Sequence, residues 1–411
     1  MTYAQAEPQP GTDAATEPEG NPMSLMPPEM ANAPQPFLKA LRDECPVMPI
    51  DDAVVLFSRA AVDEAFRDPV RFSSNMDAVD LQNVRPLIPL QIDPPDHKKF
   101  RKLLDPIFAP KQMVRLEEPI TKLANELIDG LMARDEINFG PDFSIPFPSQ
   151  VFLTLLGLPL DQLPRLLTLK DGIIRPDHVT GEKYGSEAAV DYQRGVALST
   201  YDYFNEILDL REVQREDDLL SHFLDAEVEG EKLTRNEILD ICFLFLIAGL
   251  DTVTATLDCM FAYLAQHPEK RAEIVADPSI IPAAVEELLR WETPVMTVVR
   301  VATVDTEIGG CPVKQGDGVM PMLASANTDD GDDADLGEVR FDREENRHLA
   351  FGGGIHRCLG SHLARQELRI ALREWHRRIP DYEVKPGVEL SYTGGIRSID
   401  DFPLLISPIR D

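Results

Sequence analysis

From Pro36 onward, apolar residues recur every three or four positions along most of the chain, a pattern typical of amphipathic helices. Strand-like segments are fewer and gather around turn residues. No internal repeat and no Gly/Ser-rich linker divides 37–411, so we expect one α+β domain, mainly α with a smaller β-rich portion. Helices are predicted at 99–108, 111–134, 147–157, 187–210, 234–267, 282–292 and 361–379, and strands within 46–57, 297–323 and 382–408.

Residues 1–36 have a different composition. They hold eight of the 34 prolines together with many Ala, Gln and Glu residues. Such a mixture buries too little apolar area to offset the entropy of ordering the backbone. We therefore expect a mobile N-terminal arm.

The predicted helix at 234–267 is unusually long. Thr234 followed by Glu237 forms a capping-box pattern, and no proline follows until Pro268, which allows a helix of about 50 Å. Near its middle the apolar run is interrupted by Gly249 and then by the polar pair Asp251 and Thr252. Glycine and an unpaired carboxylate are both unfavourable inside an apolar helix, so this interruption needs an explanation.

Two explanations of that interruption remain open. Ala248, Asp251, Thr252 and Ala255 share one helix face, and small or polar residues facing inward suggest that something other than a side chain packs there. Alternatively, Asp251 forms a buried salt bridge and Thr252 bonds back to the carbonyl of Ala248, as threonines within helices often do.

The net charge of the chain makes some classes of binding partner unfavourable. The 411 residues include 40 Lys and Arg against 71 Asp and Glu, a net charge of −31, which disfavours binding to nucleic acid or to anionic membranes. The charge is unevenly distributed, because 97–115 carries +5 and 343–378 carries +4, leaving −40 for the rest.

The five cysteines are widely spaced and contain no CxxC pair, so a disulfide framework is not expected. The longest apolar run, 241–250, is about half the length of a membrane span. We predict a cytoplasmic protein that binds neither membrane nor nucleic acid.

The segment Phe351-Gly-Gly-Gly-Ile-His-Arg-Cys-Leu-Gly360 directly precedes the last long predicted helix. Its glycines permit tight turns and the close approach of a flat ligand. Cys358 would lie at the helix N-terminus, where amide donors and the helix dipole stabilise a thiolate able to bind metal.

Three other interpretations of this segment are weaker. A dinucleotide fingerprint requires the spacing GxGxxG after a strand, which is absent. A zinc site built from His348, His356, Cys358 and His362 lacks paired-cysteine spacing. A purely structural turn with an inert cysteine leaves the basic residues around the loop unexplained.

The loop resembles the haem-binding signature of the cytochromes P450, Phe-Gly-x-Gly-x-His-x-Cys-x-Gly, at every fixed position. Ala248-Gly-Leu-Asp-Thr252 is similar to the family's oxygen-binding helix motif, and Glu287-Leu-Leu-Arg290 to its Glu-x-x-Arg. The three motifs occur in the family's order, and the resemblance covers 37–411. It implies the P450 fold, with a long oxygen-binding helix over haem b.

The resemblance also assigns residue roles. Cys358 would be the thiolate ligand of the haem iron, with Phe351 packed beside it and Ala248 against the haem. Glu287, Arg290 and Arg343 would form a structural network. The haem propionates would be held by His97, Arg101, Arg300 and His356, residue types suited to carboxylates.

The implied activity is insertion of one oxygen atom of O2 into a C–H bond by a monomeric bacterial-type monooxygenase. Thr252 would hold ordered water at the oxygen site, and Asp251 would relay protons from solvent. Electrons would come from NAD(P)H through a ferredoxin reductase and an acidic ferredoxin that docks on the basic segments, with Lys98, Lys102 and Arg365 as candidate contacts.

The substrate is expected to be apolar, of the terpenoid, branched-lipid, fatty-acid or steroid class. By family position, the pocket draws on 76–90, 173–179, 244–252, 295–299 and 396–399, with Leu244, Ala248, Val295, Val298 and Ile396 as its lining. Arg85 or Arg175 could anchor a carboxylate or simply lie on the surface. A peroxide-driven oxygenase and a non-catalytic haem-thiolate sensor or carrier are the alternative functions, although neither requires Asp251 and Thr252.

Overall fold

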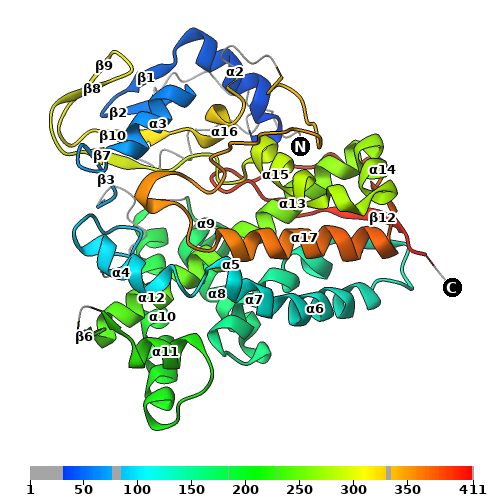
Figure 1. Cartoon of the computed structure of the whole chain (residues 1–411), viewed down its shortest axis with the longest axis horizontal. Helices are drawn as coiled ribbons and strands as arrows, with labels where there is room; N and C mark the ends of the chain where they lie inside the picture. The colour runs from blue at the N-terminus through cyan, green and yellow to red at the C-terminus, as the bar shows by residue number, and fades with distance from the viewer. Residues whose placement is uncertain (1–30, 76–84, 184, 229, 330–334, 410–411) are drawn as a thin grey trace, which may run out of the picture.

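The computed structural model describes residues 31–75, 85–183, 185–228, 230–329 and 335–409. It confirms a mainly helical fold with smaller sheets (Figure 1). The longer helices are α2 (Pro34–Glu44), α3 (Arg59–Arg67), α4 (Asp96–Leu104), α6 (Glu117–Asp129), α7 (Pro146–Leu156), α8 (Leu163–Ile174), α10 (Glu187–Val213), α11 (Leu219–Asp225), α12 (Arg235–Gly249), α13 (Thr252–Gln266), α14 (Pro268–Ala276), α15 (Ile281–Glu292) and α17 (Ser361–Arg378). Short helices are α5 (Pro110–Met113), α9 (Pro176–Thr180) and α16 (Leu323–Ala326).

The largest sheet has the strand order β1-β2-β10-β7-β3 and lies beside α2, α3 and α16 (Figure 1). Strand β10 runs parallel to β2, whereas the other neighbours in this sheet are antiparallel. The strands are β1 (Val47–Ile50), β2 (Ala53–Leu56), β3 (Phe72–Ser73), β4 (Glu136–Asn138), β5 (Glu227–Val228), β6 (Glu231–Lys232), β7 (Arg300–Ala302), β8 (Thr306–Ile308), β9 (Cys311–Val313), β10 (Gly318–Pro321), β11 (Asp381–Val384) and β12 (Pro403–Ser407).

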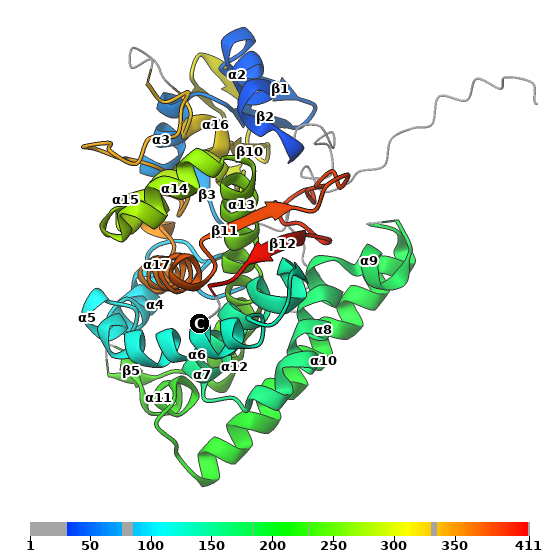
Figure 2. The same ribbon diagram turned by 90° about the vertical axis from the view of Figure 1, so that its right-hand side faces the viewer.

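Helices α12 and α13 run one after the other through the middle of the helical part, with α17 beside them (Figure 2). A buried aromatic cluster anchors α13 to α17: the rings of Phe261 and Trp375 are 5.2 Å apart, and Phe139 and Phe143 pack against both. Edge-to-face contacts of this kind add stability beyond simple area burial. The cluster fixes the distance between the central helices and the loop that precedes α17.

The predicted helix at 234–267 begins as expected, because Thr234 and Glu237 form the complete capping box. It is not continuous, however. Helix α12 ends at Gly249 and α13 begins at Thr252, with Leu250 and Asp251 between them. The polar interruption in the sequence is therefore a break in the helix.

The predicted arm at 1–36 extends too far. Residues 1–30 lie outside the described residues, but Ala31 is buried, and its carbonyl oxygen accepts a hydrogen bond of 2.7 Å from Arg397. Helix α2 then begins at Pro34. Proline is suited to the first turn of a helix, because its missing N–H is not needed there. The folded part begins before the predicted boundary.

Several helices differ from the prediction. The segment 111–134 is divided into α5, a short tight turn and α6, and α6 ends at Asp129. Helix α4 ends at Leu104 before Pro106 rather than continuing to 108. Helices α3, α8 and α14 were not predicted, since each is only nine to twelve residues long and is stabilised by packing rather than by a strong sequence signal.

Candidate active site

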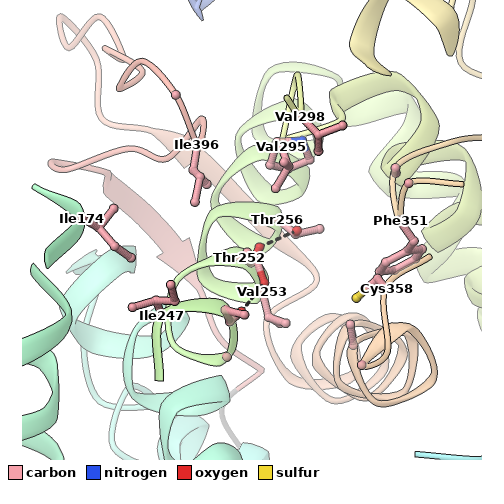
Figure 3. Close-up of a pocket in the computed structure, with 18 of the residues that line it drawn as sticks. Ile174, Ile247, Thr252, Val253, Thr256, Val295, Val298, Phe351, Cys358 and Ile396 are labelled. Carbon is pink, nitrogen blue, oxygen red and sulfur yellow. Dashed lines mark hydrogen bonds between the residues drawn. The ribbon is translucent and has the colours of Figure 1, made fainter. Parts of the chain in front are cut away.

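A large cavity of about 1030 Å³ lies between α12–α13 and the loop that precedes α17. Figure 3 shows Cys358 and Phe351 on one side of this space and Thr252, Val253 and Val295 on the other. The break between α12 and α13 and the cysteine loop, about 100 residues apart in the sequence, thus face a common cavity.

The cysteine loop is held in a tight conformation. The Cys358 N–H donates a hydrogen bond of 2.9 Å to the Phe351 carbonyl, which closes the loop. Gly352 and Gly354 have φ values of +66° and +63°, and a side chain on Gly354 would collide with the Phe66 carbonyl oxygen. The glycines therefore serve the turn and its packing on α3, and they present the Cys358 sulfur to the cavity.

The stabilisation of a Cys358 thiolate that was expected at the helix N-terminus is only partly present. Burial raises the pKa of the Cys358 thiol, whereas the Gly360 N–H and the guanidinium groups of Arg101, Arg365 and Arg357 lower it. Burial outweighs these groups, so the helix N-terminus does not by itself produce a thiolate. A coordinated cation would do so, because metal binding deprotonates a thiol.

Four predicted propionate partners gather at one edge of the cavity, where the His97 and His356 rings are 4.3 Å apart. Arg101, Arg300 and His356 line the cavity, and the Arg300 guanidinium donates to the Val299 carbonyl at 2.7 Å. Burial, together with Arg300, His97 and Arg101, lowers the pKa of His356 to about 3, and burial lowers that of Arg300 to about 10.

These residues fit the carboxylates of a haem. Among the described residues, His97 Nε2 and His356 Nε2 are buried nitrogens with no hydrogen-bond partner. A buried polar atom without a partner costs about 1–3 kcal/mol. Two carboxylates at this edge would accept bonds from both imidazoles and neutralise the two arginines, which explains why these four side chains lie together.

Asp251 is buried between two cations. Lys170 Nζ lies 2.9 Å from Asp251 Oδ1, and Arg175 Nη2 lies 3.0 Å from Asp251 Oδ2. The Thr252 hydroxyl donates a bond of 2.9 Å to the Ala248 carbonyl. The structural alternative for this polar pair is therefore confirmed, and it coexists with the cavity that Ala248 and Thr252 line.

Gly249 has its own reason for lacking a side chain. An added Cβ would lie 2.5 Å from Phe152 Cδ2, so the ring of α7 occupies that space. The small residue at this position accommodates a neighbouring side chain. Something other than a side chain is expected on a different face, that of Ala248, Asp251, Thr252 and Ala255. Of these, Ala248 and Thr252 line the cavity, and the expectation stays a prediction.

Glu287, Arg290 and Arg343 meet in a buried network. Glu287 Oε1 accepts bonds of 2.7 Å from Arg290 and 2.9 Å from Arg343. The Arg340 backbone N–H and the Asn346 side chain also donate to Glu287, which the sequence did not indicate. Arg290 and Arg343 overcome the effect of burial and hold the pKa of Glu287 below its usual range.

The candidate docking residues separate into two kinds. Lys98 and Lys102 are exposed on α4. Arg365 is mostly buried and forms a two-pronged ion pair with Glu286, with Nε 2.8 Å from Oε1 and Nη2 2.9 Å from Oε2. Arg365 is thus bound inside the fold, and its contact with a partner protein stays a prediction.

All five predicted pocket residues, Leu244, Ala248, Val295, Val298 and Ile396, line the cavity. Ile174, from the predicted segment 173–179, also lines it, as do Phe152 and Val253, which lie outside the predicted segments. Of the proposed segments, 76–84 lies outside the described residues. Val253 directly follows Thr252 in the sequence, but only the packing of α7 brings Phe152 to the cavity.

The two candidate carboxylate anchors are already paired. Arg85 lies 2.7 Å from Asp240 and stacks over Tyr201, and Arg175 is bound to Asp251 and Ser398.

His348, a ligand in the zinc interpretation, instead lies 3.0 Å from Glu286. In the described part of the chain, no group of three or more His, Cys, Asp or Glu residues could hold a metal ion.

One segment of the described chain, 235–266, is long and apolar enough to cross a membrane by composition, with 78% of its apolar window buried inside the fold. Burial to this extent is typical of a core helix, in agreement with the position of α12 and α13.

A family model described as Cytochrome P450 matches residues 186–277 and 275–378. Among curated proteins, a probable cytochrome P450 127A1 of Sinorhizobium fredii is 36% identical over 311 residues, covering 75% of this chain and 72% of the relative. A steroid C26-monooxygenase of Mycolicibacterium smegmatis is 32% identical over 350 residues, covering 85% and 82%.

Solved structures agree with these matches. CYP109E1 from Bacillus megaterium, determined in complex with testosterone, superposes with a TM-score of 0.83 at 27% identity, covering 92% of this chain and 99% of that one. The Bacillus subtilis P450 PksS superposes with a TM-score of 0.84 at 26% identity, covering 93% and 100%.

Proposed function

Since the chain belongs to the cytochrome P450 family of haem-binding monooxygenases, we propose that it hydroxylates an apolar small molecule with electrons delivered by a ferredoxin. The observation that carries the proposal is the cavity that Cys358 and Thr252 both line, with an apolar wall between α8, α12 and the loop at Ile396. Thiolate-ligated haem supplies O2 activation and oxygen insertion into a C–H bond.

In this proposal Cys358 ligates the iron and Phe351 packs beside it. His97, Arg101, Arg300 and His356 hold the propionates, which accounts for the two imidazole nitrogens that lack partners. Ala248, near the end of α12, lines the cavity, where its small side chain leaves room for a flat cofactor.

Thr252 and Asp251 are proposed to deliver protons to the oxygen-binding site. The Thr252 hydroxyl faces the cavity while bonded to the Ala248 carbonyl, so it can hold an ordered water there. The Asp251 carboxylate can carry a proton towards Thr252 only after loosening one of its two ion pairs. Its partner Arg175 also lines the cavity, so a bound substrate could contact Arg175 and thereby affect the ion pair that must loosen.

The substrate is proposed to be of the terpenoid, branched-lipid, fatty-acid or steroid class. Leu244, Val295, Val298 and Ile396 present apolar surface, and Arg175 is neutralised by Asp251. A site of this kind favours ligands that gain more from burial of apolar area than from charge. Steroids are the first class to test, because a steroid C26-monooxygenase and a structure with testosterone are among the similar proteins.

The proposed ferredoxin contact is smaller than the sequence suggested. Many cations of the two basic segments are paired internally, such as Lys99 with Glu237 and Arg365 with Glu286. Lys98, Lys102 and Arg357 are exposed around the cysteine loop and α4. In a chain of net charge −31, such a local group would steer an acidic partner to this face.

The first experiment is a titration of the purified haem-loaded enzyme with a panel of apolar compounds, following the spin shift of the iron. A strongly red-shifted carbon-monoxide band on reduction is expected from thiolate ligation. Compounds that shift the spin state should be hydroxylated when NADPH, a ferredoxin reductase and a ferredoxin are added. Turnover with peroxide but not with any reduced ferredoxin would overturn the electron-transfer part of the proposal.

The second experiment tests docking with Lys98→Glu/Lys102→Glu. We expect the ferredoxin-dependent reduction rate to fall at least tenfold at low salt, with the substrate spin shift unchanged. Lys39→Glu on α2 is the control, because it also replaces an exposed lysine with glutamate, but on the sheet portion of the molecule; it reverses one charge where the double variant reverses two. Equal reduction rates in all three proteins would exclude this surface.

A further inference from the structure

Behind the cysteine loop, Arg365 lies over the ring of Phe351, with the guanidinium carbon 4.4 Å from the ring centroid. We propose that Arg365, held in place by Glu286, is a positioning residue for Phe351 whose positive charge raises the reduction potential of the iron bound to Cys358. In this proposal Arg365 acts on the cysteine loop from within the fold and not as a contact for a partner protein.

The ion pair with Glu286 fixes the orientation of Arg365. Arg365 Nε lies 2.8 Å and 3.0 Å from the two carboxylate oxygens, and Nη2 lies 2.9 Å from one of them. A guanidinium bound by its fork is held in one plane, which a lysine ammonium would not be. This guanidinium is the one that lies over the Phe351 ring.

Glu286 is itself held from several directions. His348 Nε2 lies 3.0 Å from Glu286 Oε2, and Arg369 Nη2 lies 3.3 Å from Oε1. These donors overcome the effect of burial and lower the pKa of Glu286 to about 2. The carboxylate therefore remains charged at neutral pH and keeps Arg365 in its stacked position.

Phe351 connects this pair to the metal ligand. Its carbonyl accepts the Cys358 N–H at 2.9 Å, and its ring lies next to the Cys358 sulfur (Figure 3). A positive charge near the thiolate reduces the electron density available to the iron, which favours the ferrous over the ferric state. Glu286 counteracts that charge, so the two residues have opposite effects on the potential.

The opposite signs give a sharp test by mediator-coupled potentiometric titration of the haem-loaded enzyme. Arg365→Gln removes the positive charge and should lower the ferrous-to-ferric ratio about tenfold at a fixed potential, or about 59 mV for one electron. Glu286→Gln leaves Arg365 uncompensated and should shift the potential in the positive direction. No ferredoxin is present, so a role in docking cannot produce either result.

Arg369→Gln is the matched control, because Arg369 contacts the same carboxylate but is more exposed than Arg365. Its potential should stay close to that of the unmodified enzyme. Haem content and the carbon-monoxide band of each variant verify that the thiolate is retained. Shifts of the same sign in Arg365→Gln and Glu286→Gln, or no shift in either, would overturn the proposal.

Discussion

Asp251 and Arg175 are joined across the cavity wall, with Arg175 Nη2 3.0 Å from Asp251 Oδ2. The same Nη2 atom lies 3.0 Å from the hydroxyl of Ser398, in the loop that carries Ile396. Ile396 and Arg175 both line the cavity. The carboxylate proposed to relay protons is thus bonded to a residue that a substrate can touch.

Replacing Asp251 with Asn should separate proton delivery from binding. The amide cannot carry a proton, and it leaves Lys170 and Arg175 without their shared anion. We expect kcat to fall by about 100-fold, a typical loss for an acid–base group, with a larger solvent isotope effect and an intact substrate spin shift. Stopped-flow and steady-state kinetics in H2O and D2O measure these quantities.

Asp171→Asn is the control for Asp251→Asn. Asp171 also pairs with Lys170, at 2.6 Å, but its side chain is 37% exposed. Its loss should leave the isotope effect unchanged. A similar isotope effect in both variants would show that disturbance of Lys170, and not proton relay by Asp251, limits turnover.

Thr252→Ala should uncouple oxygen consumption from hydroxylation. The variant keeps the helix break but removes the hydroxyl that faces the cavity. We expect most of the NADPH consumed to yield peroxide instead of product, at an oxygen uptake rate within about threefold of the unmodified enzyme. An oxygen electrode and product quantification give the ratio.

Thr254→Ala is the control for Thr252→Ala. Its hydroxyl is bonded back to the Leu250 carbonyl at 3.4 Å, and the side chain is buried away from the cavity lining. Coupling should remain as in the unmodified enzyme. Full coupling in Thr252→Ala would remove the proposed role of that hydroxyl.

The sequence predicted which residues matter better than it predicted their surroundings. Cys358 could be placed from its glycine-rich loop, and His97 and His356 from the family resemblance; the rings of the two histidines do lie together, 4.3 Å apart. The partners of Asp251 and Arg365 could not be predicted, because Lys170 and Glu286 are about 80 residues away from them in sequence and are brought near only by packing. The Thr234–Glu237 capping box, in contrast, was predicted correctly, because its two residues are only three positions apart in the sequence.

The contact between Gly249 and Phe152 predicts a stability effect. Gly249→Ala gains about 1 kcal/mol of helix propensity but places a methyl group 2.5 Å from the Phe152 ring, and overpacking of this kind costs about 1–3 kcal/mol. We expect a lower midpoint of thermal unfolding. Phe152→Leu in the same chain should restore part of the loss, and strictly additive effects of the two substitutions would contradict the proposed collision.

Asp258 predicts a pH dependence that is separate from catalysis. This carboxyl is buried on α13, where it accepts bonds from the Ser144 hydroxyl at 2.5 Å and from the Ile399 N–H at 3.4 Å. Burial, with the nearby Asp251 carboxylate, raises the pKa of Asp258 from 3.8 to about 7, although Arg175 and the two hydrogen bonds oppose the increase. The folded protein therefore holds a proton that the unfolded chain releases at lower pH.

A raised carboxyl pKa in the folded state means that stability falls as pH rises between the two values. Below pH 3.8 the group is protonated in both states and has no effect, whereas above pH 7 it must ionise inside the fold. Asp258→Asn removes that cost, so its free energy of unfolding should exceed that of the unmodified protein by up to about 4 kcal/mol at pH 8. Urea unfolding at several pH values measures the difference, which should shrink towards pH 4. A difference independent of pH would mean that Asp258 is stabilised as a carboxylate by Ser144 and Ile399 in the folded state.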